Sequence, residues 1–260
     1  FGWSTNFTFS WNKNEIVELV HNYVHPETGE LITKERLEIK GLGKAKYILK
    51  PGGTLGDLYT NSDLVYNDDG YIEVDKNGNV AVKDDYMDDI YLGSVFPKYN
   101  LAWRNDFNYK GINLGVLFTA RIGVICYSAT QANMDLYGVS EASAAARDAG
   151  GVMINGRDMI DAQKWYQVIG SQSGLPQYYT YSATNVRLQE LSLGYTLPSK
   201  WFRDKMRMTV SFVGRNLWMI YCKAPFDPEA VASTGMNYQG IDYFMMPSMR
   251  NLGFNVKFQF

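Results

Sequence analysis

The chain has 260 residues, of which 46% are hydrophobic and 20% charged, and its formal net charge is -2. This composition excludes a disordered polymer, and the near-neutral charge argues against a nucleic-acid partner, which usually requires a basic surface. The mean hydropathy is -0.26, and no run approaches the roughly 18 apolar residues that a spanning helix needs, so a helical membrane protein is excluded as well.

Six segments alternate apolar and polar residues, which predicts β-strands because successive side chains of a strand point to opposite faces. In chain order they are residues 2–12, 99–109, 112–125, 186–197, 206–217 and 251–260. The fourth segment is the least regular, since Val186 and Leu188 fall on the face opposite to the apolar residues from Leu191 onward. We expect its first part to extend above a membrane.

Charge is distributed unevenly between the two faces of these strands. The apolar phase has 33 positions, namely the odd positions of 3–11, 99–109 and 191–197 and the even positions of 112–124, 206–216 and 252–260. None of them is charged, although a charged fraction of 20% would place about six or seven charges there by chance. Burying a basic residue in lipid at mid-bilayer costs about 2–4 kcal/mol, which explains such an asymmetry. The pattern therefore favours strands with one face toward lipid.

Strand length and loop order agree with a membrane barrel. Tyr99 and Tyr109 lie ten residues apart, which spans roughly 26 Å at ~3.4 Å per residue and ~40° tilt, close to the ~25 Å apolar band of such barrels. The turns at 110–111 and 198–205 are short, whereas 13–98, 126–185 and 218–250 are long. Outer-membrane barrels have short periplasmic turns and long extracellular loops.

We expect some structure inside the long loops. Asp75–Asn79, between residues 71–74 and 80–82, predicts a small hairpin because Asn77-Gly78 suits its turn. Ser140 and Asp161 are helix caps ahead of two short predicted helices.

The fold class predicted is therefore all-β, as part of a transmembrane antiparallel β-barrel. Six strands do not close a barrel, since the smallest bacterial ones have about eight and an open edge in lipid leaves backbone groups unpaired. We expect residues 1–260 to be the C-terminal portion of a larger barrel. The chain begins at Phe1 rather than Met, and we expect a processed or truncated N-terminus.

Several motifs in a fixed order resemble the SusC/RagA family of TonB-dependent outer-membrane transporters. The hallmark segment is 186–198, VRLQELSLGYTLP, and the others are residues 214–217 (GRNL), 226–229 (FDPE) and 240–243 (GIDY), with the aromatic-terminated last strand. Residues 3–7 with 12–17, and 138–141 with 146–148, match further upstream. Residues 18–98 match least.

The resemblance implies a parent barrel of about 22 strands with an N-terminal plug, in the outer membrane of a Gram-negative, Bacteroidetes-type cell. Such a multi-pass protein imports a glycan, oligosaccharide or peptide. It is driven by a TonB-ExbB-ExbD complex and capped by a SusD-like surface lipoprotein. The plug and the TonB-contacting segment would lie outside this chain.

Three groups of side chains are candidates for function. Arg104, Asp106, Arg121, Glu190, Arg207 and Arg215 are the charges expected to face the lumen. Phe254, Val256, Phe258 and Phe260 are expected to form the C-terminal signal for barrel assembly, by analogy with outer-membrane proteins. Trp165, Tyr166, Tyr178, Tyr179 and Tyr181 could stack on sugar rings; the alternative is that they pack the long loop or contact the lid protein.

Metal, thiol and catalytic chemistry are weakly indicated. His21 and His25 have no third ligand nearby, and the acidic cluster Asp84, Asp85, Asp88 and Asp89 suggests at most calcium in an extracellular loop. Cys126 and Cys222 are expected at the outer ends of the third and fifth strands, ~10 Å apart, too far for a disulfide. No catalytic or cofactor motif is present, so we expect no enzyme and no cofactor.

Two alternatives remain open on the sequence alone. Aromatic residues at 15% suit a secreted, soluble β-sandwich that binds carbohydrate as well as they suit membrane girdles. A passive, plugless outer-membrane channel would share the strand pattern.

Overall fold

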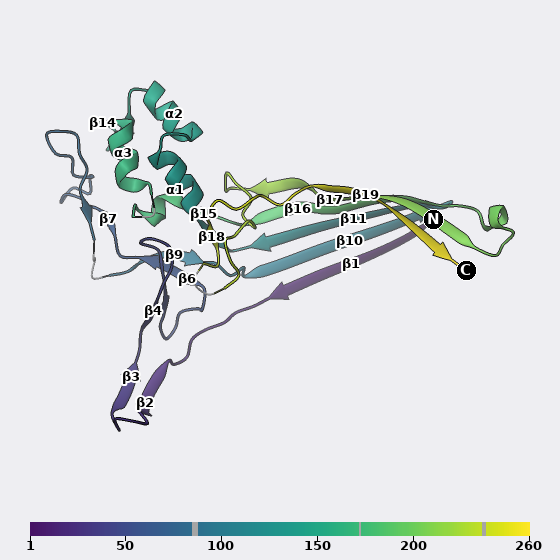
Figure 1. Cartoon of the computed structure of the whole chain (residues 1–260), viewed down its shortest axis with the longest axis horizontal. Coiled ribbons are helices and arrows are strands. Elements are labelled where there is room, and N and C mark those ends of the chain that lie inside the picture. Colours follow the sequence, from purple (N-terminus) through teal and green to yellow (C-terminus); the bar gives the residue numbers. More distant parts are fainter. Residues whose placement is uncertain (85–87, 172, 236–237) are drawn as a thin grey trace.

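A six-stranded antiparallel sheet dominates the computed structural model, which describes residues 1–84, 88–171, 173–235 and 238–260 (Figure 1). The strand order is β1-β10-β11-β16-β17-β19, so each strand pairs with the next long strand in the chain. These strands are β1 (Gly2–Trp11), β10 (Tyr99–Tyr109), β11 (Ile112–Ile122), β16 (Asn185–Thr196), β17 (Arg207–Cys222) and β19 (Asn251–Gln259). All six predicted strands are thereby confirmed, as an open sheet with β1 and β19 at its edges.

The connections divide between the two ends of the sheet (Figure 1). Lys110 and Gly111 join β10 to β11 with φ angles of 47° and 87°, the doubly positive backbone of a tight hairpin turn. A short segment with the 3-10 helix η2 (Ser199–Phe202) joins β16 to β17 at the same end, where both termini also lie. The three long loops gather at the opposite end. The predicted alternation of short and long connections is confirmed.

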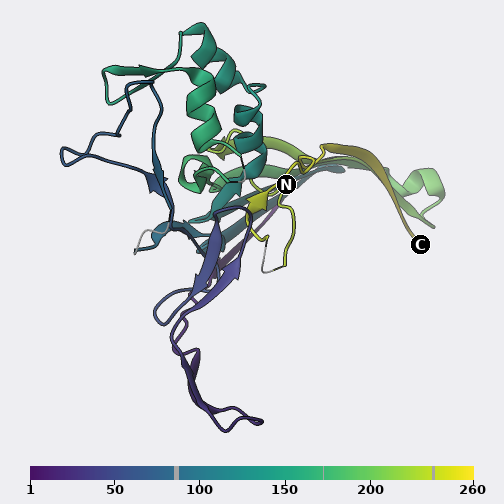
Figure 2. The same cartoon turned by 60° about the vertical axis from the view of Figure 1, so that its left-hand side comes forward.

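The first long loop forms small sheets of its own. A four-stranded sheet combines β4 (Leu37–Lys40), β5 (Lys46–Leu49), β6 (Asp57–Thr60) and β9 (Ile90–Ser94). The hairpin of β2 (Val20–Val24) and β3 (Leu31–Lys34) projects away from the body (Figure 2). The predicted Asp75–Asn79 turn is present, closed by a single bridge between Val74 and Val80. Beyond it, β7 (Asp63–Leu64) pairs with β8 (Val82–Lys83).

The second long loop carries the helices. Ser140 caps α2 (Glu141–Asp148) and Asp161 caps α3 (Ala162–Ile169), which confirms both predicted helices. Sequence reasoning missed α1 (Ala129–Leu136), whose N-cap is Ser128. The remaining elements are β12 (Ile125–Ser128), β13 (Val152–Ile154), β14 (Asp158–Ile160), the 3-10 helix η1 (Pro176–Tyr179) and β15 (Thr180–Ser182). From the third loop, β18 (Ile241–Asp242) joins β12 in parallel.

The hydrophobic core lies among the loops, not against the large sheet. Tyr127, Leu58 and Ile241 are almost fully buried there, together with side chains from α1 and α3. The apolar face of the sheet is open instead: Phe254 is 81% exposed, Phe258 is 52% exposed and Leu114 is only half-buried. None of the described residues forms a second sheet over that face, and so the β-sandwich alternative is wrong.

No helix within the described ranges is both long and apolar enough to cross a membrane.

The third strand ends earlier in the structure than the sequence predicted. Residues 112–125 were expected to be continuous, but β11 stops at Ile122 and Gly123 adopts a φ of 75°. The chain turns there because a left-handed residue breaks the ladder. Ile125 then starts β12, which pairs with β15 and β18 in a separate sheet. Cys126 therefore lies in the buried loop core and not at the tip of a wall strand.

A β-bulge corrects the prediction for the fourth strand. Leu117 of β11 pairs with Glu190, but the next residue, Phe118, pairs with Leu188, so Gln189 is an extra residue in β16. A bulge of one residue reverses the alternation. Leu188 and Val186 therefore lie on the same apolar face as Leu191, which corrects the predicted change of face. That this part extends above a membrane stays a prediction.

The fifth strand is longer than predicted for a related reason. It was expected to end at residue 217, yet β17 continues to Cys222. Asn216 has a φ of 52°, and the register shifts so that Arg215 pairs with Glu190 while Trp218 pairs with Leu188. The irregular stretch is an interruption within one strand, and pairing resumes beyond it.

Candidate functional site on the polar face of the sheet

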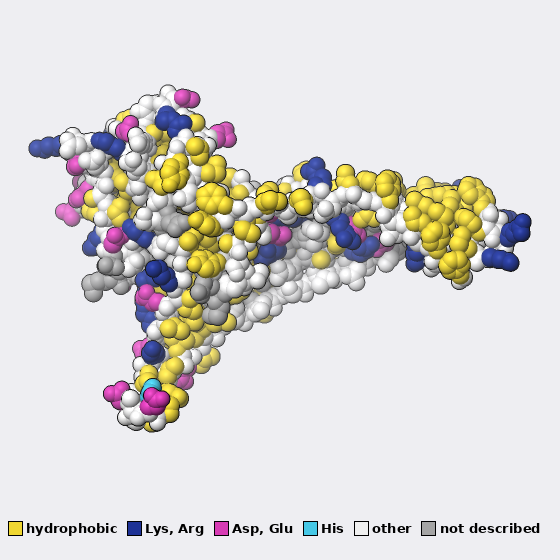
Figure 3. Space-filling model, viewed as in Figure 1, with side chains coloured by type: hydrophobic (Ala, Val, Ile, Leu, Met, Phe, Trp, Pro, Cys, Tyr) yellow, Lys and Arg dark blue, Asp and Glu magenta, His cyan; other side chains and the backbone are white. Residues whose placement is uncertain are grey.

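The register gathers charged side chains in one row across the polar face. Arg104 in β10 is aligned through Leu117 with Glu190 in β16 and then with Arg215 in β17. Figure 3 shows side chains of both signs along the middle of the sheet. Because each residue comes from a different strand, their proximity follows from strand pairing.

These residues form an ion-pair network centred on Glu190. Its Oε1 lies 3.4 Å from Nη1 of Arg104 and its Oε2 lies 3.0 Å from Nε of Arg215. Nε of Arg104 also lies 2.9 Å from Oδ2 of Asp106. Glu190 thus links three strands, and each half-exposed pair contributes on the order of 0.2–1 kcal/mol.

Gly115 provides the space for this network. A Cβ atom at position 115 would lie 2.5 Å from Oγ of Ser192 and 2.9 Å from Oδ1 of Asp106. Such contacts are too close for real carbon atoms, so a side chain here would require the Ser192 hydroxyl and the Asp106 carboxylate to shift. Glycine at this position therefore lets both groups keep their places in the row.

The other two predicted lumen residues lie elsewhere on the sheet. Nη1 of Arg121 lies 3.7 Å from Oε1 of Glu229, which belongs to the third long loop. Arg207 begins β17 near the short turns, is exposed and pairs with Gln259. That all six residues face a lumen stays a prediction.

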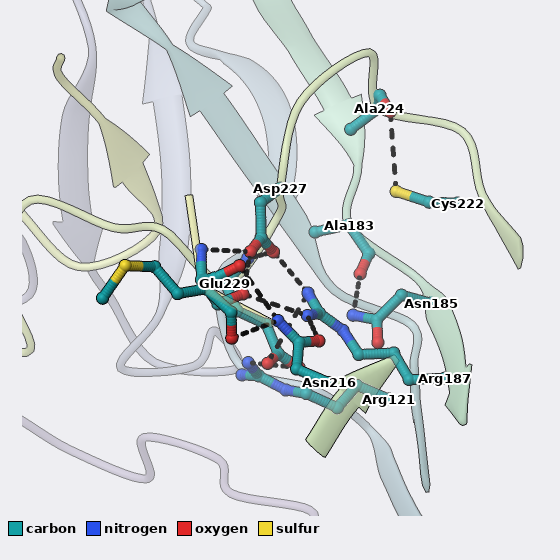
Figure 4. Close-up of polar contacts among 11 residues, drawn as sticks. Arg121, Ala183, Asn185, Arg187, Asn216, Cys222, Ala224, Asp227 and Glu229 are labelled. Carbon is teal, nitrogen blue, oxygen red and sulfur yellow. Dashed lines mark hydrogen bonds and ion pairs between the residues drawn. The ribbon is translucent and has the colours of Figure 1, made fainter. Parts of the chain in front are cut away.

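The most buried charge on the sheet is Arg187, which sequence reasoning did not select. It pairs with Thr119, on the same polar face as Arg121, and only 2% of it is exposed. Its guanidinium forms an ion pair with Asp227, and Nη1 donates to Oδ1 of Asn216 at 3.0 Å (Figure 4). Without knowledge of the bulge at Gln189, simple alternation placed Arg187 on the wrong face.

Asp227 completes a clamp over this end of the sheet. It accepts hydrogen bonds from the Ser248 hydroxyl, from N of Ser248 at 2.9 Å and from N of Glu229 at 3.1 Å. Asn216 donates through Nδ2 to the Ser248 carbonyl at 3.0 Å. We call Arg187, Asn216, Asp227 and Ser248 the outer clamp, because they tie both ends of the third long loop to β16 and β17.

The electrostatics of the clamp favour a charged pair. Burial alone would raise the pKa of Asp227, but hydrogen bonds from Ser248 and Arg187 outweigh it, and the net effect lowers that pKa. Arg187 also lies 3.6 Å from Glu229. Since the carboxylate oxygens of Asp227 are already occupied, the clamp is suited to fixing a loop and leaves little capacity for a ligand.

The aromatic residues predicted as sugar-stacking candidates pack the loop instead. Trp165 is 6% exposed and Tyr179 is 2% exposed. Trp165 meets Tyr178 edge-on at 5.9 Å between ring centroids, and Tyr181 meets Phe226 at 5.5 Å. Tyr166 is also packed against this core. The burial of Trp165 and Tyr179 favours the packing alternative for these two residues. Stacking of Tyr166, Tyr178 and Tyr181 on sugar rings stays a prediction.

The predicted assembly signal lies on the edge strand β19. Phe254, Val256 and Phe258 share its apolar face and are exposed, and Phe260 at the end of the chain is 98% exposed. Phe254 contacts Phe212 of β17 edge-on at 5.6 Å. Recognition of these residues by an assembly machinery stays a prediction.

Two carboxylates of the predicted calcium cluster form ion pairs with basic side chains. Nζ of Lys44 lies 2.7 Å from Asp84, and Arg36 and Lys46 contact Asp89; Asp85 lies outside the described residues. Hydrogen bonds from Arg36 lower the pKa of Asp89. Calcium in the loops stays a prediction.

The predicted histidine pair lies in the β2–β3 hairpin. His21 lies on β2 and His25 follows it, where its Nδ1 accepts from the turn. Among the residues that the structure describes, no three His, Cys, Asp or Glu side chains cluster as a metal site.

Cys126 and Cys222 are both free thiols. Burial raises the pKa of Cys126 to about 12, so its thiol stays protonated at neutral pH.

Comparison with known proteins agrees with the family resemblance. No family model matches the chain. The curated relative "TonB-dependent receptor P3" of Formosa agariphila is 24% identical over 286 residues, covering 99% of this chain and 27% of the relative. The chain therefore spans about a quarter of that protein's length.

Solved structures show the same fold. The RagAB peptide transporter superposes with a TM-score of 0.59 at 16% identity, over 98% of this chain and 27% of that one. The RagAB peptide importer in its 'open-open' state gives a TM-score of 0.53 at 16% identity, over 98% and 26% of the two chains. These likenesses confirm the resemblance to SusC/RagA-type transporters and the fold class, of which this chain forms a fragment. The relatives are described as a receptor and a transporter, not as enzymes, in agreement with the prediction.

Proposed function

We propose that this chain forms the C-terminal part of the wall of a TonB-dependent outer-membrane importer, which takes up an oligopeptide or oligosaccharide. The observation that carries the proposal is the inverted arrangement of the sheet. Its apolar face is exposed and uncharged, whereas its charges form an ion-pair network on the opposite face. Lipid is the solvent that satisfies the first face, and a polar lumen satisfies the second.

The dimensions of the sheet support a membrane-spanning wall. β10 has 11 residues, with Tyr99 and Tyr109 at its two ends. Such a strand, tilted by ~40°, crosses the ~25 Å apolar band with a tyrosine at each interface. The edges β1 and β19 leave unpaired backbone groups that lipid does not satisfy. The remaining strands, the plug and the TonB-contacting segment would therefore belong to sequence outside residues 1–260.

The loop end of the sheet would face the cell exterior. Family resemblance supports a SusD-like surface lipoprotein as the partner there, and a TonB-ExbB-ExbD complex acting through the plug on the other side. The RagAB structures, described as a peptide transporter, support an oligopeptide as one substrate class. An oligosaccharide is the second class.

Uptake by cells tests this proposal. Cells with the intact gene, cells without it and cells without TonB would be given a fluorescent oligopeptide or oligosaccharide, with the protein located by membrane fractionation. We expect outer-membrane location and uptake of one substrate that requires both the gene and TonB. Recovery of the full-length protein in the aqueous fraction would refute the membrane assignment. Uptake that persists without TonB would instead identify a passive channel.

A further inference from the structure

A pocket lies at the loop end of the sheet, outside the ion-pair network and the outer clamp. Its volume is about 1020 Å³, and it is open to solvent. Its walls combine the end of β1, the start of β10 and the loop segments next to β6 and β9. The pocket therefore lies where the wall of the sheet passes into the loop layer.

The apolar wall of the pocket continues the apolar face of the sheet. Trp11 and Tyr99 line it and pair with each other across β1 and β10. They are 63% and 38% exposed, and Phe9 stacks on Tyr99 at 5.9 Å. Exposed Trp and Tyr at the end of an apolar strand face are typical of the membrane–water interface.

The polar wall of the pocket is basic where it is accessible. Lys13, Lys50 and Lys98 line it. Lys13 is two residues from Trp11 in the sequence, and Lys98 directly precedes Tyr99. Lys13 pairs with Glu15 at 3.6 Å, and Lys50 lies over the Tyr59 ring at 5.0 Å. Within the described part of the chain, neither Lys50 nor Lys98 forms an ion pair with a carboxylate. Two cations are thus available to an anion.

Asp57, one of the two acidic residues that line the pocket, has its carboxylate oxygens engaged by hydrogen bonds. Asp57 is only 5% exposed. It accepts from N of Thr54 at 2.8 Å and from Oγ1 of Thr54 at 2.6 Å, and Tyr91 donates to it at 3.3 Å. Its carboxylate is therefore buried and already occupied. The other acidic lining residue, Glu15, forms its ion pair with Lys13, which leaves Lys50 and Lys98 for an anion.

We propose that this pocket binds the phosphorylated headgroup of an outer-leaflet lipid, whose acyl chains lie on the apolar face beyond Trp11 and Tyr99. Lys50 and Lys98 neutralise the phosphate, as basic residues do at membrane surfaces. A single amphiphile thereby covers the aromatic pair and the lysines together. The inference rests on the proposed membrane orientation, which places the loop end at the outer interface.

Lipid retention by the purified full-length protein tests the site. The protein in detergent would be incubated with phosphatidic acid or with phosphatidylcholine of identical acyl chains, and bound lipid would be counted by native mass spectrometry. We expect preferential retention of phosphatidic acid. The double variant Lys50→Gln, Lys98→Gln should weaken its binding about ten- to thirty-fold, because each basic residue near a lipid phosphate contributes to the affinity.

Two matched variants control for charge and for folding. Lys50→Arg with Lys98→Arg keeps both charges and should retain the lipid. Lys200→Gln with Lys205→Gln removes two charges near the short turns, at the opposite end of the sheet, and should change nothing.

Three results would overturn the lipid site. The first is equal retention of phosphatidic acid and phosphatidylcholine. The second is a loss of lipid in the Lys200 and Lys205 control equal to that in the Lys50 and Lys98 variant. The third is full displacement of the lipid by inorganic phosphate, which would identify a site for the free anion. A protein that fractionates with the outer membrane but shows any of these results loses the lipid site alone. A protein found in the aqueous fraction loses the proposed function.

Discussion

Single residues determine how the third long loop is held against the sheet. Arg187, Asn216 and Asp227 lie in three of the motifs that carry the family resemblance, and the structure brings them together in the outer clamp. Removing one partner of a buried ion pair leaves the other charge uncompensated and typically costs about 3–5 kcal/mol. These motif residues therefore have a shared structural role.

The first prediction concerns Arg187→Met in the full-length protein. It should leave Asp227 buried without its cation and free the third long loop, so that protease cuts within 223–250 at least about ten-fold faster. Arg215→Met, which removes a more exposed arginine of the ion-pair network, is the matched control and should change cleavage little. Equal protection of the loop in both variants would contradict the clamp.

The second prediction is a pH dependence of the same loop. The pKa of Asp227 is lowered from its usual value of 3.8. A lowered pKa contributes stability that is fully present above the unfolded-state pKa and is lost as pH falls through the folded-state pKa. Cleavage by an acid-tolerant protease should therefore stay constant from pH 7 to pH 5 and rise only below about 3.8. Release of the loop between pH 5 and pH 7 would show that another group controls it.

The third prediction compares two glycines of the sheet. Gly115→Ala should displace Asp106 or Ser192, at a cost of about 1–3 kcal/mol for overpacking. A Cβ atom on Gly253 meets nothing within 4 Å, so Gly253→Ala should be nearly neutral. The midpoint of urea unfolding in lipid vesicles measures both. Equal midpoints would show that the row of charges tolerates a side chain at 115.

Among the elements, β16 depends most on a local irregularity. The bulge at Gln189 brings Val186 and Leu188 onto the apolar face and Arg187 onto the polar one. Regular pairing of every residue from Val186 to Leu191, with Gln189 included in the ladder, would reverse all three. The bulge is therefore required for the clamp and for an uncharged apolar face.

The fourth prediction follows from this dependence. Deleting Gln189 should leave both faces unchanged, because Leu188 then directly precedes Glu190, just as their partners Phe118 and Leu117 are adjacent. We expect folded protein in the outer membrane, measured as the heat-modifiable band on gels. Deleting Ser192, which has a partner in the regular part of the strand, should instead direct Glu190 toward lipid and reduce the folded protein. Equal loss of assembly in the two deletion variants would refute the assigned register.

At the scale of the whole molecule, the two faces of the sheet suit different solvents. The loops carry the buried core, and the sheet presents exposed apolar side chains on one face and paired charges on the other. This arrangement is stable in a membrane and would expose a large apolar area in water.

The fifth prediction tests the two faces with adjacent residues of β11. Val116 belongs to the apolar face, whereas Leu117 is aligned with Arg104 and Glu190. Val116→Lys should reduce folded protein in lipid vesicles by the equivalent of about 2–4 kcal/mol. Leu117→Lys should cost clearly less, because Glu190 lies nearby. The reverse order would show that the faces are assigned incorrectly.

Sequence periodicity identified all six wall strands, both caps Ser140 and Asp161, and the order of short and long connections. Those features are local, since alternation depends on neighbouring residues and a cap depends on three or four of them. Sequence reasoning failed where the chain departs from regular geometry, at Gly123, Gln189 and Asn216. Each is a turn or bulge that depends on partner strands.

The sequence by itself thus determined that one face of the sheet is uncharged, because alternation along each strand assigns residues to a face independently of the strand's partners. Only the tertiary structure decided which charges meet. Arg187 and Asp227 are 40 residues apart, and the aromatic cluster of the second loop is buried by segments that are distant in sequence. Pair formation and burial depend on strand register and on long-range packing, and a periodic pattern contains neither.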